Sequence, residues 1–152
     1  MADIVERTTA LIALRPGRAS AAAAALGRAL PPMGRFIEAD GLLLARVAPM
    51  QLLAMQAGAD QPLMQTLAPV ADHAGLIDLS DARFGVRLSR RALPHLLPLD
   101  LHAIEPGQCP STLVAHMSVL VLCHAPDSFE VQVMRSYERY FRRAIDSAEA
   151  LA

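Results

Sequence analysis

Prolines end several of the apolar segments of this chain. Hydrophobic residues make up 53% of its 152 residues, and 11 prolines are spread among them. Proline fixes φ and lacks an amide donor, so it ends helices and is rare inside central strands. The prolines that interrupt apolar segments include Pro16, Pro31, Pro32, Pro49, Pro69 and Pro126. The sequence therefore predicts many short elements, and no apolar run approaches the ~20 residues of a membrane span.

Short apolar runs in the first half predict strands. Residues 8–14 and 41–47 have the length and composition of strands, and each run ends close to a proline. Residues 50–55 fit either a strand or a short helix, because so brief an apolar run does not settle its own period. We favour a strand for this segment.

Two helices are predicted between these strands and after them. Residues 19–30 are rich in alanine, which has the highest intrinsic helix propensity, and Pro31 would end the helix. Residues 62–70 predict a second helix that begins near Pro62 and places Leu63, Leu67 and Val70 on one face.

The second half predicts strands with clearer patterns. Residues 83–89 alternate, with Phe84, Val86 and Leu88 on one face, and a short helix should follow up to Leu97. Further strands are expected over residues 112–116, 119–124 and 129–134. Residues 119–123 are apolar on both faces, so this strand should be central in its sheet.

The chain should end in an amphipathic helix that Ser136 caps. Apolar and aromatic residues recur there at three- and four-residue intervals: Tyr137, Tyr140, Phe141, Ala144, Ile145 and Ala148. We expect this face to pack on a sheet. The order of elements predicts an α+β fold, with helices packed on a mostly antiparallel sheet and two pseudo-similar halves. No linker or change of composition divides residues 1–152, so we expect a single domain.

Charge and cysteine content exclude several functions. The formal net charge is −1, which disfavours binding to nucleic acid or to an anionic membrane. All 14 basic side chains are arginines, so no lysine is present for a Schiff base or a phosphate-binding loop. The N-terminal segment lacks the form of a signal peptide, and two cysteines are too few for a disulfide framework. We expect a soluble cytoplasmic protein.

The potential metal ligands do not form a convincing site. They are His73, His95, His102, His116 and His124, with Cys109 and Cys123. Zinc needs three or four converging ligands, but Cys123 and His124 are adjacent on a predicted strand and should point to opposite faces. Cys109 follows a Pro-Gly turn and could be a reactive thiol, but no neighbouring base or helix N-terminus is evident. A small buried residue is the better interpretation.

Other polar residues also favour structural roles. Ser80 and Asp78 could join a histidine in a catalytic triad, but no serine lies in a G-x-S-x-G elbow. Short polar side chains at Asp78, Ser80 and Asp81 favour a turn instead. Asp100 should either pair with an arginine, such as Arg87 or Arg135, or cap nearby amides. We therefore predict no catalytic, cofactor-binding or metal-binding residue in this chain.

Three phrases of the second half resemble a known family. They are residues 78–83 (DLSDAR), residues 98–102 (PLDLH) followed by residues 106–109 (PGQC), and residues 129–137 (FEVQVMRSY). Together they resemble the γ (small) subunit of heterotetrameric sarcosine oxidase. They cover less than half of the chain, in the family's order. One departure is Arg90-Arg91, where relatives tend to carry a Gly-Pro pair.

The resemblance implies a fold similar to the folate-binding domain of the glycine-cleavage T-protein. It implies a non-catalytic γ subunit in a complex that oxidises the N-methyl group of sarcosine or a similar amine. FAD, FMN, NAD, zinc and tetrahydrofolate would then belong to the partners, which are the larger α and β flavoprotein subunits and a small zinc-binding δ subunit. The alternative is a free-standing domain that binds tetrahydrofolate and transfers one-carbon groups. Purification would distinguish the two hypotheses. A subunit should copurify with large flavin-bearing partners, whereas a free-standing domain should be monodisperse and bind tetrahydrofolate.

Overall fold

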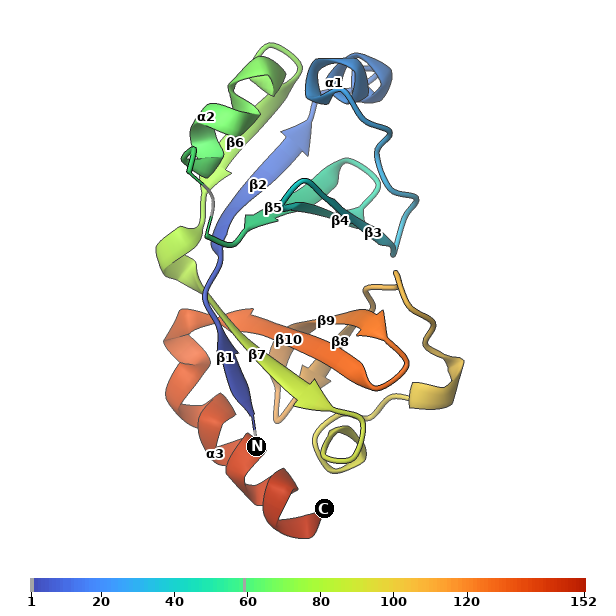
Figure 1. Ribbon diagram of the computed structural model, residues 1–152, viewed down its shortest axis with the longest axis vertical. Helices are drawn as coiled ribbons and strands as arrows, with labels where there is room; N and C mark the ends of the chain where they lie inside the picture. The colour runs from blue at the N-terminus through green and yellow to red at the C-terminus, as the bar shows by residue number, and fades with distance from the viewer. Residues whose placement is uncertain (1, 59) are drawn as a thin grey trace. The chain divides into compact units, whose positions relative to one another are not determined.

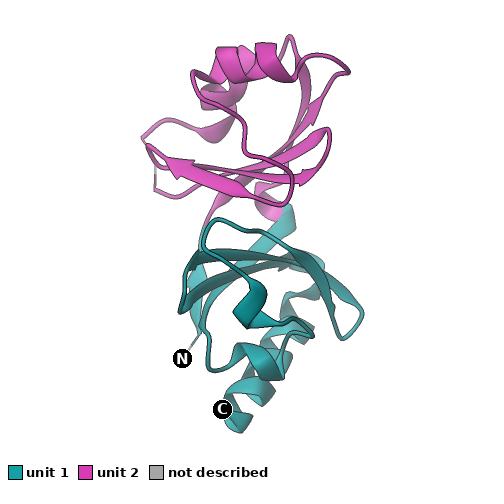
Figure 2. Ribbon diagram, turned by 90° about the vertical axis from the view of Figure 1, so that its right-hand side faces the viewer, with its two compact units in different colours: residues 1–6, 82–152 teal, residues 7–81 magenta. Residues whose placement is uncertain are grey.

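The computed structural model describes residues 2–58 and 60–152 and forms two compact units (Figures 1 and 2). Unit 2 comprises Arg7–Asp81, and unit 1 comprises Ala82–Ala152 with the short segment that ends at Glu6. Each unit contains one five-stranded sheet in which all pairings are antiparallel. The predicted α+β fold with two similar halves is confirmed, and each half has its own sheet. The single-domain assignment of residues 1–152 stays a prediction.

The sheet of unit 1 has the strand order β1-β7-β10-β9-β8. Its strands are β1 (Asp3–Val5), β7 (Arg83–Ser89), β8 (Ser111–Val114), β9 (Met117–Ala125) and β10 (Ser128–Met134). The predicted alternation in β7 is confirmed, because Phe84, Val86 and Leu88 are buried while Arg87 and Ser89 are exposed. Strand β9 is paired on both sides and buried on both faces over residues 119–123, as its composition predicts.

Strand β8 ends two residues earlier than the predicted segment 112–116. Ala115 and His116 have φ values of 45° and 70°, so they form a two-residue turn between Val114 and Met117, which are register partners. Turns with two left-handed residues match the twist of an antiparallel hairpin. This turn could not be predicted from the sequence, because the usual Asn-Gly or Asp-Gly pair is absent.

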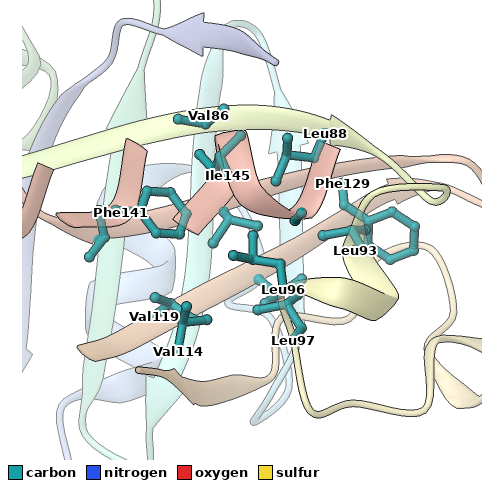
Figure 3. Packing of buried hydrophobic residues seen from close by; sticks show 14 of the residues in the cluster. Val86, Leu88, Leu93, Leu96, Leu97, Val114, Val119, Phe129, Phe141 and Ile145 are labelled. Atoms are coloured by element: carbon teal, nitrogen blue, oxygen red, sulfur yellow. The ribbon is translucent and has the colours of Figure 1, made fainter. Parts of the chain in front are cut away.

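Helix α3 (Glu138–Leu151) covers one face of the unit 1 sheet. Phe141, Ile145 and Ala148 are buried and pack among apolar side chains of the sheet and of the segment that follows β7 (Figure 3). The core shown there includes Val86, Leu88, Leu93, Leu96, Leu97, Val114, Val119 and Phe129. This segment contains two 3-10 turns, Leu93–His95 and Leu101–Ala103, in place of the predicted short helix.

The predicted packing of Tyr137 and Tyr140 is wrong. Their exposed fractions are 43% and 64%, whereas that of Phe141 is 0%. Tyr140 lies about 100° around the helix from Phe141, off the buried stripe. Tyr137 belongs to the 3-10 turn Arg135–Tyr137, which precedes the α-helix and breaks its periodicity. Ser136 lies inside that turn, so it does not cap the helix, and no side chain hydrogen-bonds as a cap there.

The sheet of unit 2 has the strand order β3-β4-β5-β2-β6. Its strands are β2 (Thr8–Leu14), β3 (Phe36–Ala39), β4 (Leu42–Ala48), β5 (Gln51–Gln56) and β6 (Ala74–Asp78). The strand preferred for residues 50–55 is confirmed as β5. Helix α2 (Leu63–Leu67) and the 3-10 turn Ala68–Val70 bury Leu63, Leu67 and Val70, as predicted.

Helix α1 (Ala19–Leu26) is shorter than the predicted segment 19–30. Gly27 adopts a left-handed conformation with φ of 67°, and its amide donates to the carbonyl oxygens of Ala23 and Ala24. A glycine in this conformation is a common helix terminator, and it acts here before Pro31 is reached. None of the helices in the described part of the chain is long and apolar enough to span a membrane.

Candidate functional site

The histidines and cysteines do not converge in the structure. Within residues 2–58 and 60–152, no group of three or more His, Cys, Asp or Glu side chains is placed to hold a metal ion. Cys123 lies in the core of unit 1, while its neighbour His124 bonds to Glu130 on the opposite face of the sheet. The two side chains therefore point apart, as predicted.

Cys109 is buried rather than reactive. Only 3% of it is exposed, and burial raises the pKa of its thiol to about 11. Cys123 is fully buried, and desolvation raises its thiol pKa in spite of the opposing effect of the nearby Arg90 charge. Thiols that stay protonated at neutral pH are poor nucleophiles and poor metal ligands.

Asp78 and Ser80 form a turn that follows β6 and hydrogen-bonds to Thr9 on β2. The Ser80 amide donates to Asp78 Oδ1 at 2.9 Å, and the Thr9 amide donates to Ser80 Oγ at 3.2 Å. The Ser80 hydroxyl in turn donates to the Thr9 carbonyl at 3.4 Å, so it serves the backbone and not a histidine. These bonds hold the carboxylate in its charged form, and the hydrogen bond from the Ser80 backbone is the main cause of the lowered pKa of Asp78.

Asp100 caps a turn, which was one of its two predicted roles. Its Oδ1 accepts a hydrogen bond of 3.0 Å from the His102 amide at the start of the 3-10 turn Leu101–Ala103. The arginines considered as partners pair elsewhere: Arg87 with Glu130, and Arg135 with Glu138.

Arg90 connects three segments of unit 1. Its Nε donates to the Pro126 carbonyl at 2.8 Å, and its Nη2 donates to the Leu101 carbonyl at 3.2 Å. Its guanidinium also lies 5.8 Å from the ring centroid of Phe129. Arg90 thus supplies a fork of donors that fixes the end of β7 to two turns.

Unit 1 contains a buried polar network that the sequence did not predict. Glu130 has an exposed fraction of 0%, and Gln132, two residues later on β10, has 2%. Gln132 Nε2 donates to Glu130 Oε1 at 2.6 Å. Glu130 Oε2 lies 3.0 Å from His124 Nε2 and 3.6 Å from Arg87 Nη2. Both oxygens of the carboxylate are therefore engaged.

Three strands build this network through their register. Arg87 on β7 lies directly opposite Glu130, and Gly85 lies opposite Gln132. On β9, the register shifts between Ser128 and Phe129, and His124 is the extra residue at this bulge. A bulge redirects a side chain, and here it lets His124 reach the carboxylate while Cys123 stays in the core.

Gly85 makes room for Gln132. A Cβ atom at Gly85 would collide with Gln132 Nε2 and would lie 3.0 Å from Gln132 Cδ. The absent side chain on β7 therefore provides the space in which Gln132 turns toward Glu130. The neighbours on β9 are Leu120 and Leu122, which are buried, so the network lies among apolar side chains.

This arrangement places polar partners on both oxygens of a carboxyl group that is fully buried. A buried charge is tolerated only when it is paired and hydrogen-bonded, which the three partners of Glu130 achieve. We interpret the network as a set of side-chain contacts that stabilises the observed register of β7, β9 and β10. The sequence signal was the pair Glu130 and Gln132 at alternate positions with Gly85 across the sheet, but a solvated strand face has the same pattern. The absence of site residues from this chain stays a prediction.

Comparison with known proteins supports the fold. No family model and no curated protein matches the chain. The solved structure of heterotetrameric sarcosine oxidase from Corynebacterium sp. U-96 in complex with pyrrole 2-carboxylate matches with a TM-score of 0.83 and 22% sequence identity. That match covers 99% of this chain and 84% of the other chain. Methanococcus jannaschii TBP matches with a TM-score of 0.34 and 8% identity, values too low to indicate a common fold. This chain therefore has the α+β fold of a chain in heterotetrameric sarcosine oxidase.

Proposed function

We propose that this chain is the small γ-type subunit of a sarcosine oxidase-like complex that demethylates N-methyl amino acids. The observation that carries the proposal is the fold match over 99% of the chain. The matched chain is only somewhat longer than this one, because the match covers 84% of it. That length supports a small subunit rather than one domain of a large flavoprotein. The three sequence phrases are independent support.

The proposed role of the chain is to support assembly rather than catalysis. Side chains of types that often act in catalysis have structural positions here. Glu130 belongs to the buried network, Asp78 and Ser80 form a turn, and Cys109 lies in the interior. FAD, FMN, NAD, zinc and tetrahydrofolate would be bound by the α, β and δ subunits. The complex would act in the cytoplasm.

Co-expression tests this proposal. The chain should be produced with the larger flavoprotein subunits of the same organism and, in parallel, alone. We expect a flavin-containing complex that retains this chain through size exclusion. Omission of the chain should reduce assembly or stability of the complex but should not remove the bound flavins.

Two results would contradict the proposal. In the first, the larger subunits assemble and turn over normally without this chain, and it never co-elutes with them. In the second, the isolated chain is monodisperse and binds tetrahydrofolate in calorimetry. The second result would support the free-standing one-carbon-transfer domain instead.

A further inference from the structure

An exposed cluster of arginines lies at the start of α3. Arg135, Arg139, Arg142 and Arg143 line a shallow depression together with Ser136 and Glu138. All four arginines are exposed, and Glu138 is the only acidic residue between positions 135 and 143. We call these four arginines the arginine patch. It concentrates positive charge in a chain whose formal net charge is −1.

Two arginines of the patch, Arg139 and Arg143, do not stabilise the helix on which they lie. Arg139 and Arg143 are four residues apart on α3, and like charges at this spacing repel on a helix. Arg135 lies in the 3-10 turn that precedes the helix. Arg139 lies in the first turn of α3, where the helix dipole disfavours a cation, while Glu138 in the same turn is favourably placed. At the other end of the helix, Glu149 lies in the last turn, where the dipole disfavours an anion. Arg139 and Glu149 are therefore not placed to stabilise the helix.

Two arginines of the patch are held in place. Glu138 accepts hydrogen bonds from Arg135 at 3.3 Å and from Arg142 at 2.8 Å. The guanidinium carbons of Arg142 and Arg135 lie 4.7 Å and 6.0 Å from the ring centroid of Phe84. Among the described residues, Arg139 and Arg143 have no side-chain hydrogen bond or ion pair. Their guanidinium groups are therefore available to an acidic partner.

Apolar side chains surround the charge. Met134, Tyr137 and Tyr140 precede and interleave with the arginines, and their exposed fractions are 40%, 43% and 64%. Arginine, tyrosine and methionine are the residue types that are enriched at protein interfaces, and tyrosine and arginine are common hot-spot residues. Nucleic-acid binding needs a broader basic field than one helix end in a chain with a net negative charge.

We infer that the arginine patch, with Met134, Tyr137 and Tyr140, docks onto an acidic surface of a larger subunit of the complex. This inference rests on the proposed function. Carboxylates of the partner would pair with Arg139 and Arg143, while the tyrosine rings would bury apolar area beside them. Pairing would also remove the repulsion between the arginines, so binding relieves a cost that the isolated helix carries.

A charge-matched pair of variants tests the inference. Arg139→Gln/Arg143→Gln removes two charges from the patch, and glutamine has nearly the helix propensity of arginine. The control, Arg15→Gln/Arg18→Gln, removes two exposed arginines from unit 2. Affinity of the full chain for the purified larger subunits is measured by calorimetry at low and high salt.

We expect the patch variant to bind at least about tenfold more weakly and the control to stay within about twofold of the wild type. Wild-type affinity should fall as salt rises, and the patch variant should lose most of that dependence. The melting temperature of the isolated patch variant should be equal to or above that of the wild type. A lower melting temperature would mean that the arginines are structural and would overturn the inference.

The remaining outcomes separate this inference from the proposed function. If the wild-type chain forms no complex, the proposed function fails. If the complex forms and both variants bind equally well, the docking surface is wrong and the proposed function stands. Parallel titrations use a short single-stranded RNA and vesicles that contain phosphatidylserine. One further result would overturn the inference: the wild-type chain binds the RNA or the vesicles, the patch variant does not, and both form the complex equally well. The patch would then be assigned to that ligand.

Discussion

At the residue scale, the network around Glu130 depends on a glycine on the neighbouring strand. Gln132 reaches Glu130 only because Gly85 leaves space for its amide. The side chain of Gln132 is a flexible group, but its hydrogen bond to a buried carboxylate restrains it. A side chain at position 85 of β7 would therefore displace the Gln132 amide that hydrogen-bonds to Glu130 on β10.

We predict that Gly85→Ala lowers the free energy of unfolding by about 1–3 kcal/mol, because the new methyl group overpacks the site. Gln132→Ala should also destabilise, since Glu130 loses a donor. The double variant should be more stable than the sum of the two effects predicts. Urea denaturation of the four proteins in a double-mutant cycle measures this coupling. Simple additivity would show that the two positions do not interact.

The thiol of Cys109 gives a prediction about pH. Its pKa rises from 9.0 to about 11 in the folded chain, so the folded state retains the proton where the unfolded state has lost it. This contribution to stability is complete below pH 9.0 and is lost as pH rises through about 11. Urea midpoints should therefore fall less steeply over this range for Cys109→Ala than for the wild type. Identical slopes would argue against a buried thiol.

At the element scale, the buried stripe of α3 can be separated from its exposed aromatic residues. We predict that Phe141→Ala lowers the free energy of unfolding by about 3–5 kcal/mol, because a fully buried ring is replaced by a cavity. The matched variant Tyr140→Ala should change it by less than about 0.5 kcal/mol, because that ring is exposed. Chemical denaturation of both variants is the measurement. Equal losses would place both rings in the core.

Helix and strand interiors could be predicted from this sequence, whereas their ends and edges could not. The interiors of β2, β4, β5, β7, β9 and β10 follow from apolar runs and alternation. The edge strands β1, β3 and β6 were missed because their formation depends on pairing with a neighbouring strand, whereas the fourth edge strand, β8, was predicted from its own residues. The end of α1 at Gly27 and the turn at Ala115 and His116 depend on left-handed backbone conformations.

The roles of some polar residues could also be predicted from the sequence, whereas those of others could not. The turn at Asp78 and Ser80 and the cap at Asp100 could be predicted, because short side chains bond to backbone groups nearby in sequence. The network of Glu130 could not, because it needs three strands in register and a bulge at His124. The exposure of Tyr137 was missed because a 3-10 turn does not keep the period of the α-helix that follows.

At the scale of the whole molecule, we predict that the isolated chain carries no stoichiometric flavin, zinc or folate. Its two cysteines are buried, and their thiol pKa values are raised by desolvation. Dialysis against EDTA should leave the melting temperature unchanged, and the visible spectrum should lack a flavin band. About one zinc per chain in metal analysis, or a yellow purified protein, would contradict this prediction.

The position of unit 2 within the chain bears on folding order. Strand β1 must pair with β7, which lies on the far side of residues 7–81, and the entropy cost of closing such a loop grows with the logarithm of its length. Once unit 2 has folded, the Leu79 amide donates to the Thr9 carbonyl at 2.7 Å, so the two ends of the inserted segment already meet. The loop that remains to be closed is then only a few residues long. Folding of unit 2 thus converts a long-range pairing into a nearly local one, and we expect β1 to pair with β7 only after unit 2 has folded.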